Sequence, residues 1–158
     1  EQLIPLGQVF PDATFVIPHR DPVSVTISLL TMMTYSARMS RDPVKPKVIA
    51  DYWVDRIEKM LMACVRDIDQ LPQQQLIHVR FDEFMADDIA TIERIYNLAD
   101  HEMTEHVRKA MRQYTVDNPR GKYGRVRYDL KGDFGFDAGE LYERFAFYTD
   151  RFDVKLER

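Results

Sequence analysis

The chain has 158 residues and a net charge of −4, from 22 basic and 26 acidic side chains. This balance argues against general nucleic-acid binding, which usually needs a basic excess. Apolar residues make up 45% of the chain, which argues against disorder and suits one globular domain. Cys64 is the sole cysteine, so an intramolecular disulfide is excluded. The sequence contains no apolar run of about 18 residues, the length needed to cross a membrane. Because the start of the sequence lacks a signal-peptide pattern, we expect a cytoplasmic protein.

The first third of the sequence predicts a strand that leads into a helix. Residues 2–10 have helical spacing but contain Pro5 and Gly7, so they predict a short helix. The β-branched and aromatic run 14–18 predicts a buried strand. Asp21 followed by Pro22 is typical of a helix start and predicts a helix to about Arg38, followed by a loop over 39–47.

The remainder alternates helices with one further strand. Apolar spacing predicts a long helix over 48–70 and a strand over 76–80. Further helices are expected over 88–99, 103–116 and 137–149, and a long functional loop over 117–135, which holds four of the six glycines. Two strands separated by helices favour parallel pairing and an α/β fold with helical crossovers. Two parallel strands alone make a poor sheet, so we expect part of a larger domain.

The segment FVIPHRDPVSVTIS has the chemistry of a phosphate site. Arg20 stands at the carboxyl edge of the predicted strand, where ligands of α/β sheets collect, and its fork suits phosphate. Ser28 lies two turns into the next helix and Ser24 one turn in. Taken alone, Arg20 more often caps a helix or pairs with an acid such as Asp21 or Asp82, and a helical serine is more often merely exposed or bonded to the backbone.

Longer stretches of the chain resemble one family. The segment FPDATFVIPHRDPVSVTISL is similar to the 3′-phosphate-binding segment of sulfotransferases, in which a Ser follows the Arg by eight residues. The runs YWVDRIEKML, HVRFDEFMADDIATIERIYNL, NPRGKYGRVRYDLKGDFGF and ELYERFAFYTDRF resemble later family segments in the same order. The chain is therefore identified as similar to the sulfotransferase family, in its bacterial-type branch, with a partial P-loop-type fold.

The resemblance implies 3′-phosphoadenosine 5′-phosphosulfate as the donor, adenosine 3′,5′-bisphosphate as the product and no metal. It implies that Arg20 and Ser28 hold the donor 3′-phosphate, helped by the loop residues Arg120, Gly121 and Lys122, and that Phe81 stacks near the adenine. A structural role for Phe81, as an aromatic residue of the core, is an equally good interpretation. A solvated basic loop is the alternative for the cluster Arg120, Lys122, Arg125 and Arg127. Val126 stands where the family often has His.

Other candidate residues are interpreted as structural. His101 and His106 are five apart and so face different sides of a helix, unlike a zinc-binding pair. His19 neighbours Arg20 on the strand, where adjacent side chains point to opposite faces, and it is taken as structural, as is His78. Cys64 lies on an apolar helical face and predicts a buried, inert thiol.

The resemblance also implies that the catalytic His and the 5′-phosphosulfate loop lie upstream of Glu1. We therefore expect residues 1–158 to be the C-terminal part of one sulfotransferase domain, inactive by itself. The acceptor, a small molecule or glycan with a hydroxyl or amine, is expected near residues 31–55. The alternatives are a non-catalytic nucleotide-binding module or a helical interaction module. The expected protein partner is either a second copy of the chain, in a homo-oligomer, or the N-terminal part of the domain.

Overall fold

The computed structural model describes residues 2–122, 124 and 126–157, and the chain divides into two compact units. The sheet unit comprises Gln2–His19 and Asp69–Val126, and the helical unit comprises Arg20–Ile68 and Arg127–Arg158. The boundary falls between His19 and Arg20, directly after the first strand. Each unit is described by itself.

The sheet unit is built around two parallel strands, β1 (Phe15–His19) and β2 (Leu76–Arg80). Phe15 pairs with Leu76 and His19 pairs with Arg80, in a continuous register. The predicted parallel pairing is therefore confirmed, and the chain is an α/β protein with long helical connections. Phe15 and His19 are buried while Val16 is exposed, which is the alternation expected of a strand with one covered face.

The rest of this unit is mainly helical. Its helices are α1 (Leu3–Val9), α4 (Phe81–Ala86), α5 (Asp88–Leu98) and α6 (Glu105–Asp117), with 3-10 turns at Ile68–Gln70, across the boundary, and Gln73–Gln75. Helices α4 and α5 pack against β2. The sequence missed α4 entirely. Asp82 and Glu83 lie in its first turn, where the positive end of the helix dipole stabilises negative charge.

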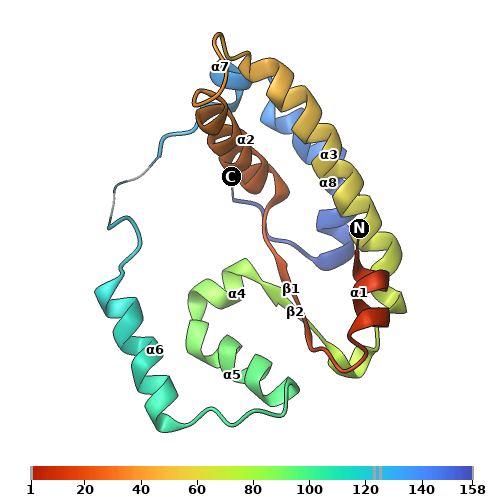
Figure 1. Ribbon diagram of the computed structural model, residues 1–158, viewed down its shortest axis with the longest axis vertical. Helices are drawn as coiled ribbons and strands as arrows, with labels where there is room; N and C mark the ends of the chain where they lie inside the picture. The colour runs from red at the N-terminus through yellow and green to blue at the C-terminus, as the bar shows by residue number, and fades with distance from the viewer. Residues whose placement is uncertain (1, 123, 125, 158) are drawn as a thin grey trace. The chain divides into compact units, whose positions relative to one another are not determined.

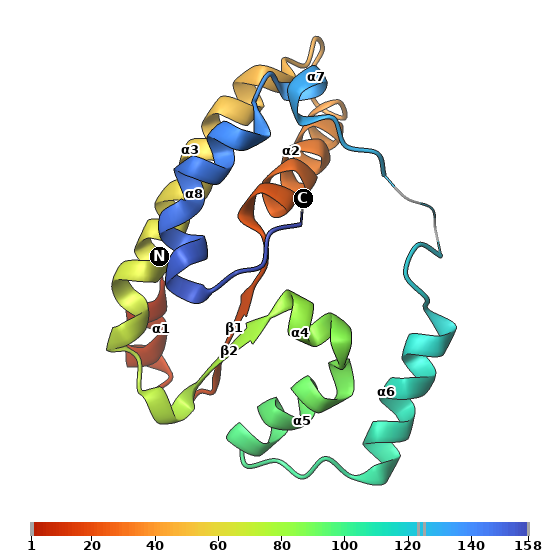
Figure 2. The same ribbon diagram turned by 180° about the vertical axis from the view of Figure 1, so that it is seen from behind.

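The helical unit consists of α2 (Pro22–Ala37), α3 (Pro46–Asp67), α7 (Leu130–Phe134) and α8 (Ala138–Phe152). Helices α3 and α8 lie side by side in both ribbon views, and α2 packs against both (Figures 1 and 2). Leu30, Val54 and Phe145 are completely buried between them, and Trp53 packs against this core. The apolar stripes of the three long helices thus form one hydrophobic core.

Helix α2 begins as predicted, with Asp21 as the capping residue and Pro22 in the first turn. The Asp21 carboxylate is fully buried and accepts hydrogen bonds from the backbone N–H groups of Val23, at 2.8 Å, and Ser24, at 3.4 Å. It also accepts from the Tyr142 hydroxyl on α8 at 3.2 Å and from the Glu157 N–H at 2.7 Å. One carboxylate therefore caps α2 and joins it to the end of the chain.

The structure differs from both predicted loops. The expected loop over 39–47 ends earlier, because Pro46 opens α3 as its first-turn proline. The expected loop over 117–135 contains the short helix α7, in which Leu130 and Phe134 are buried one turn apart. Gly135 ends α7 with φ of 73°, a left-handed conformation that glycine adopts without steric cost.

Candidate functional site

Arg20, the central residue of the predicted phosphate site, is held by a carboxylate of its own unit. Its Nε donates to Glu157 Oε1 at 2.6 Å and its Nη2 donates to Oε2 at 2.8 Å. These hydrogen bonds, ahead of the charge of Glu157, raise the pKa of Arg20 above its already high ordinary value. The side chains are 39% and 35% exposed, so the pair stands at the surface, where an anion can reach it.

Ser28 lies on the exposed side of α2, two turns after its cap. Its hydroxyl lies 3.3 Å from the hydroxyl of Tyr128, in the segment that leads from the glycine-rich loop into α7. Tyr128 was not among the predicted site residues. Its position two residues after Val126, in a segment already singled out for anion binding, was the available signal.

The start of α2 offers few free hydrogen-bond donors to an anion. The N–H groups of Val23 and Ser24 both bond to the Asp21 carboxylate, and the Ser24 hydroxyl lies 3.4 Å from Asp21 Oδ2. Ser24 is thereby tied to the cap. The side chains of Arg20 and Ser28 are the donors of this segment that stand at the surface.

The structure brings Phe81 and Arg120 together within the sheet unit. The guanidinium carbon of Arg120 lies 5.6 Å from the centre of the Phe81 ring, a cation–π arrangement. Phe81 is the first residue of α4, directly after β2, so it stands at the carboxyl edge of that strand. It is half-buried, so the ring is not a fully enclosed core aromatic.

Gly121 and Lys122 form a turn beyond α6. Gly121 has φ of 78°, and the N–H of Lys122 donates to the carbonyl of Pro119. The Lys122 ammonium donates to the Asp117 carbonyl at 2.7 Å, where a cation complements the carboxyl end of helix α6. Arg125, the third member of the predicted basic cluster, lies outside the described residues, and Arg127 belongs to the helical unit.

A histidine pair lies at the sheet. His19 Nε2 is 2.7 Å from His78 Nδ1, and the rings stack with centroids 5.0 Å apart. Burial, and secondarily the neighbouring His78, lowers the pKa of His19 to about 4. His19 is 1% exposed and neutral at pH 7, which agrees with a structural role. Cys64 is half-buried on α3, and burial raises the pKa of its thiol, as expected for an inert cysteine.

Two features are absent from the described part of the chain. No group of three or more His, Cys, Asp or Glu side chains there is arranged to hold a metal ion. None of the helices in that part of the chain combines the length and apolar character of a membrane span.

A parallel strand that ends at His19 and is followed at once by a capped helix is a typical α/β arrangement, in which ligands often bind near the carboxyl ends of the strands. The chain belongs to the sulfotransferase family, whose sequence profile matches residues 1–105. The matched region contains Arg20, Ser28 and Phe81 and ends before the loop residues Arg120 to Lys122. No curated protein sequence matches the chain.

Two solved structures are similar in fold. The sulfotransferase STF9 from Mycobacterium avium superposes with a TM-score of 0.83 at 25% identity, over 99% of this chain and 40% of that one. The sulfotransferase STF1 from Mycobacterium tuberculosis H37Rv superposes with a TM-score of 0.69 at 21% identity, over 92% of this chain and 36% of that one. The chain thus spans less than half the length of either protein.

Proposed function

We propose that this chain binds the nucleotide end of 3′-phosphoadenosine 5′-phosphosulfate in a sulfotransferase, with Arg20 and Ser28 holding the 3′-phosphate. The observation that carries the proposal is the bidentate grip of Arg20 on the two oxygens of Glu157. A carboxylate presents oxygens at nearly the spacing of two phosphate oxygens, so the fork is already oriented for an oxyanion.

Donor binding at this place is an exchange of anions. The 3′-phosphate displaces Glu157 from the Arg20 fork and accepts a hydrogen bond from the Ser28 hydroxyl. Tyr128, which shares a hydrogen bond with Ser28, is close enough to supply a second hydroxyl donor. Because the phosphate carries more negative charge than a carboxylate, it competes well for the same guanidinium.

The family resemblance assigns residues of the sheet unit to the same donor, and their local geometry is compatible with that role. The ring of Phe81 offers a stacking face for adenine, although it lacks a hydroxyl for base recognition. Arg120 already lies over that ring and can stack or pair with an anion from there. Gly121 lets the backbone approach an anion closely, and Lys122 adds a cation on the same turn.

The reaction assigned to the family is an in-line displacement at sulfur. The acceptor oxygen or nitrogen forms a bond to sulfur while the bond from sulfur to the 5′-phosphate oxygen breaks. The bonding pair leaves on adenosine 3′,5′-bisphosphate, and a base takes the acceptor proton. The residues that we assign here anchor the donor, and the base is not among them. Positioning and charge stabilisation do most of the work in such group transfers.

Calorimetric titration with two nucleotides tests the assignment. Adenosine 3′,5′-bisphosphate and adenosine 5′-monophosphate differ only in the 3′-phosphate, so their affinity ratio reports the Arg20 site. We expect the bisphosphate to bind more tightly and Arg20→Ala to lower its affinity about 10- to 100-fold, the range for charged hydrogen bonds. Lys131→Ala, which removes an exposed cation of the same unit, is the matched control.

An unchanged bisphosphate affinity in Arg20→Ala removes the basis for the site. Failure of the wild-type chain to bind the bisphosphate at all favours the helical interaction module instead.

A further inference from the structure

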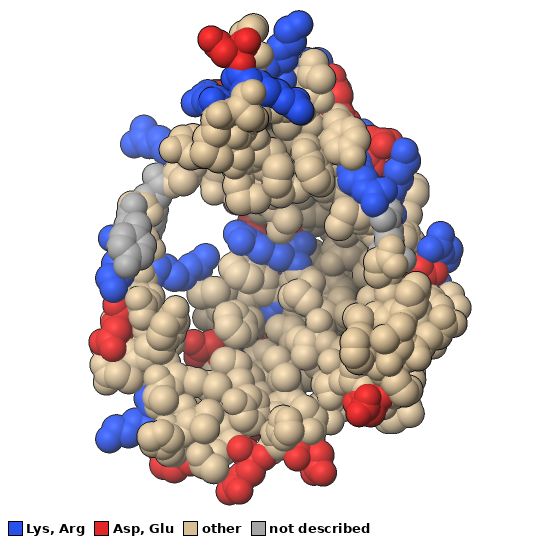
Figure 3. Space-filling model, viewed as in Figure 1, with Lys and Arg blue, Asp and Glu red and all other residues tan. Residues whose placement is uncertain are grey.

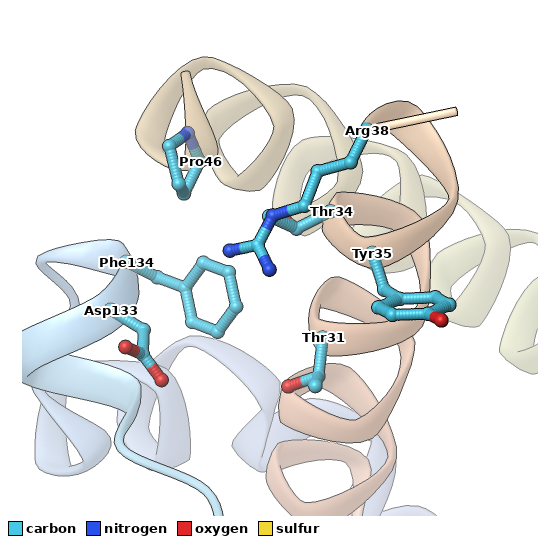
Figure 4. A pocket seen from close by; sticks show the side chains of 7 residues that line it. All are labelled: Thr31, Thr34, Tyr35, Arg38, Pro46, Asp133 and Phe134. Atoms are coloured by element: carbon cyan, nitrogen blue, oxygen red, sulfur yellow. The ribbon is translucent and has the colours of Figure 1, made fainter. Parts of the chain in front are cut away.

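The helical unit contains a cavity that is lined by none of the residues assigned to the sulfate donor. It is a partly open pocket of about 160 Å³ between the second half of α2, the start of α3 and α7 (Figure 4). Its wall includes hydroxyl, guanidinium, carboxylate and aromatic groups, from Thr31, Thr34, Tyr35, Arg38, Asp133 and Phe134. Phe134 also belongs to the hydrophobic core of the unit, so the polar groups of this wall border that core.

Thr34 gives the first sign that the cavity takes a polar ligand. The residue is 6% exposed, and its buried Oγ1 has no hydrogen-bond partner among the residues that the structure describes. Leaving a buried hydroxyl unpaired costs about 1–3 kcal/mol. The neighbouring Thr31 differs, because its hydroxyl donates to the Ile27 carbonyl at 2.8 Å and keeps its lone pairs as acceptors.

Arg38 gives the second sign. Its guanidinium lies over the cavity and points toward the Phe134 ring (Figure 4). Within the described residues it makes no ion pair, whereas Arg20 and Arg144 are each paired with a glutamate of the same unit. Arg41 and Lys45 are exposed on the following loop, and Lys and Arg side chains gather around this end of the unit in the space-filling view (Figure 3). Asp42 lies on the same loop, and Arg38, Arg41 and Lys45 still leave an excess of positive charge on this side of the cavity.

The opposite wall supplies complementary chemistry. The Asp133 carboxylate has no ion-pair partner within the described residues, and an unpaired carboxylate accepts hydrogen bonds from ligand hydroxyls. The Phe134 ring is 3% exposed and faces the cavity, where it offers an apolar surface to the C–H face of a ring (Figure 4). Hydroxyl groups fit Asp133 and the two threonines, and an acidic group fits Arg38.

We propose that this cavity binds the acceptor, and that the acceptor is a hydroxylated ring bearing a carboxylate that pairs with Arg38. The proposal rests on the proposed function and names its substrate class. Thr31 and Tyr35 follow Ser28 by three and seven residues, so they share its face of α2, about 5 and 10 Å further along the helix axis. The acceptor thus lies beside the donor anchor without occupying it.

The test compares two sugars that differ in one carboxylate. D-glucuronate and D-glucose are titrated against the chain by ligand-observed NMR, with saturating adenosine 3′,5′-bisphosphate to occupy Arg20. We expect glucuronate to bind about tenfold more tightly, the gain from one charge-assisted hydrogen-bonded pair. Arg38→Gln should make the two affinities equal, and Lys131→Gln, an equal loss of charge at an exposed position of α7, should keep the ratio.

Thr34→Val is a second test of the same cavity. The substitution keeps the side-chain shape and removes the unpaired hydroxyl, so it should weaken both sugars while leaving their ratio unchanged. A purely structural Thr34 would leave both affinities unaltered.

Equal binding of the two sugars, binding of neither, or an unchanged ratio in Arg38→Gln would overturn the proposal. The affinity for adenosine 3′,5′-bisphosphate is measured separately in each variant, so loss of the donor site and loss of the acceptor cavity are distinguished.

Discussion

The Arg20 guanidinium and the Glu157 carboxylate form a two-point contact across 137 positions of sequence, with N–O distances of 2.6 and 2.8 Å. The Glu157 backbone N–H is itself fixed by Asp21, at 2.7 Å. The glutamate is therefore placed over Arg20 by the same buried carboxylate that caps α2, and it competes with any anion that approaches the fork.

Removing this competitor should strengthen nucleotide binding. In Glu157→Gln, we expect the affinity for adenosine 3′,5′-bisphosphate to rise about two- to fivefold, because a partly exposed ion pair is worth up to about 1 kcal/mol. Calorimetry at low salt measures it. Glu140→Gln, an exposed acid in the first turn of α8, controls for the change in net charge. Equal gains in both variants would show a general charge effect and no competition at Arg20.

The Asp21 cap should matter more for stability than an exposed cap. Asp21→Ala removes the acceptor that the Tyr142 hydroxyl and three backbone N–H groups share, so we expect the free energy of unfolding to fall by about 2–4 kcal/mol. Asp137→Ala removes the exposed cap of α8 and should cost about 1 kcal/mol. Urea denaturation followed by circular dichroism measures both. Similar losses in the two variants would contradict the role given to Asp21.

The His19 pair should make stability depend on pH. The folded pKa of His19 is about 4, below the ordinary 6.5, so the unfolded chain binds more protons between these values. The contribution is fully present above pH 6.5 and is lost as the pH falls to 4, by about 3 kcal/mol.

The pH profile of unfolding in urea measures this loss. His19→Gln should flatten the profile in that window, and His101→Gln, at an exposed histidine, should leave it unchanged. An NMR titration that finds the folded His19 near pKa 6.5 would contradict the explanation directly.

Phe145 should be the most sensitive aromatic in the helical core. It is completely buried, and Phe145→Ala should lower the free energy of unfolding by about 3–5 kcal/mol through lost burial and a residual cavity. Phe10→Ala, at a residue 53% exposed, should cost far less. Chemical denaturation of the two variants makes the comparison, and a loss below about 1 kcal/mol at Phe145 would contradict the packing described.

Local chemistry explains what the sequence predicted well. Asp21 and Pro22 favour a helix start through their own side chains, so the first residue of α2 was predicted correctly. The strands were found because β-branched runs are bounded by turns, and their parallel order followed from the helices between them. The short helices α4 and α7 were missed because helices of five or six residues have too little periodicity to register.

Contacts between distant segments of the chain could not be predicted from the sequence. Nothing local marks Glu157 as the partner of Arg20 or Tyr128 as the neighbour of Ser28, since each pair joins segments at least 100 residues apart. The Phe81–Arg120 contact is of the same kind, although the family resemblance had assigned both residues to one ligand. The cavity beneath Arg38 also depends on α7, whose existence the glycine-rich composition concealed.

Trp53 is the only tryptophan of the chain, and it packs against the core of the helical unit with the Tyr52 ring 5.4 Å away, edge-on. Its fluorescence therefore reports on that unit alone. The histidine pair and the parallel strands lie in the other unit and are invisible to this emission. Melting curves recorded by tryptophan emission and by far-ultraviolet dichroism will coincide only if the two units unfold together, so a spectrometer can measure their cooperativity without any label.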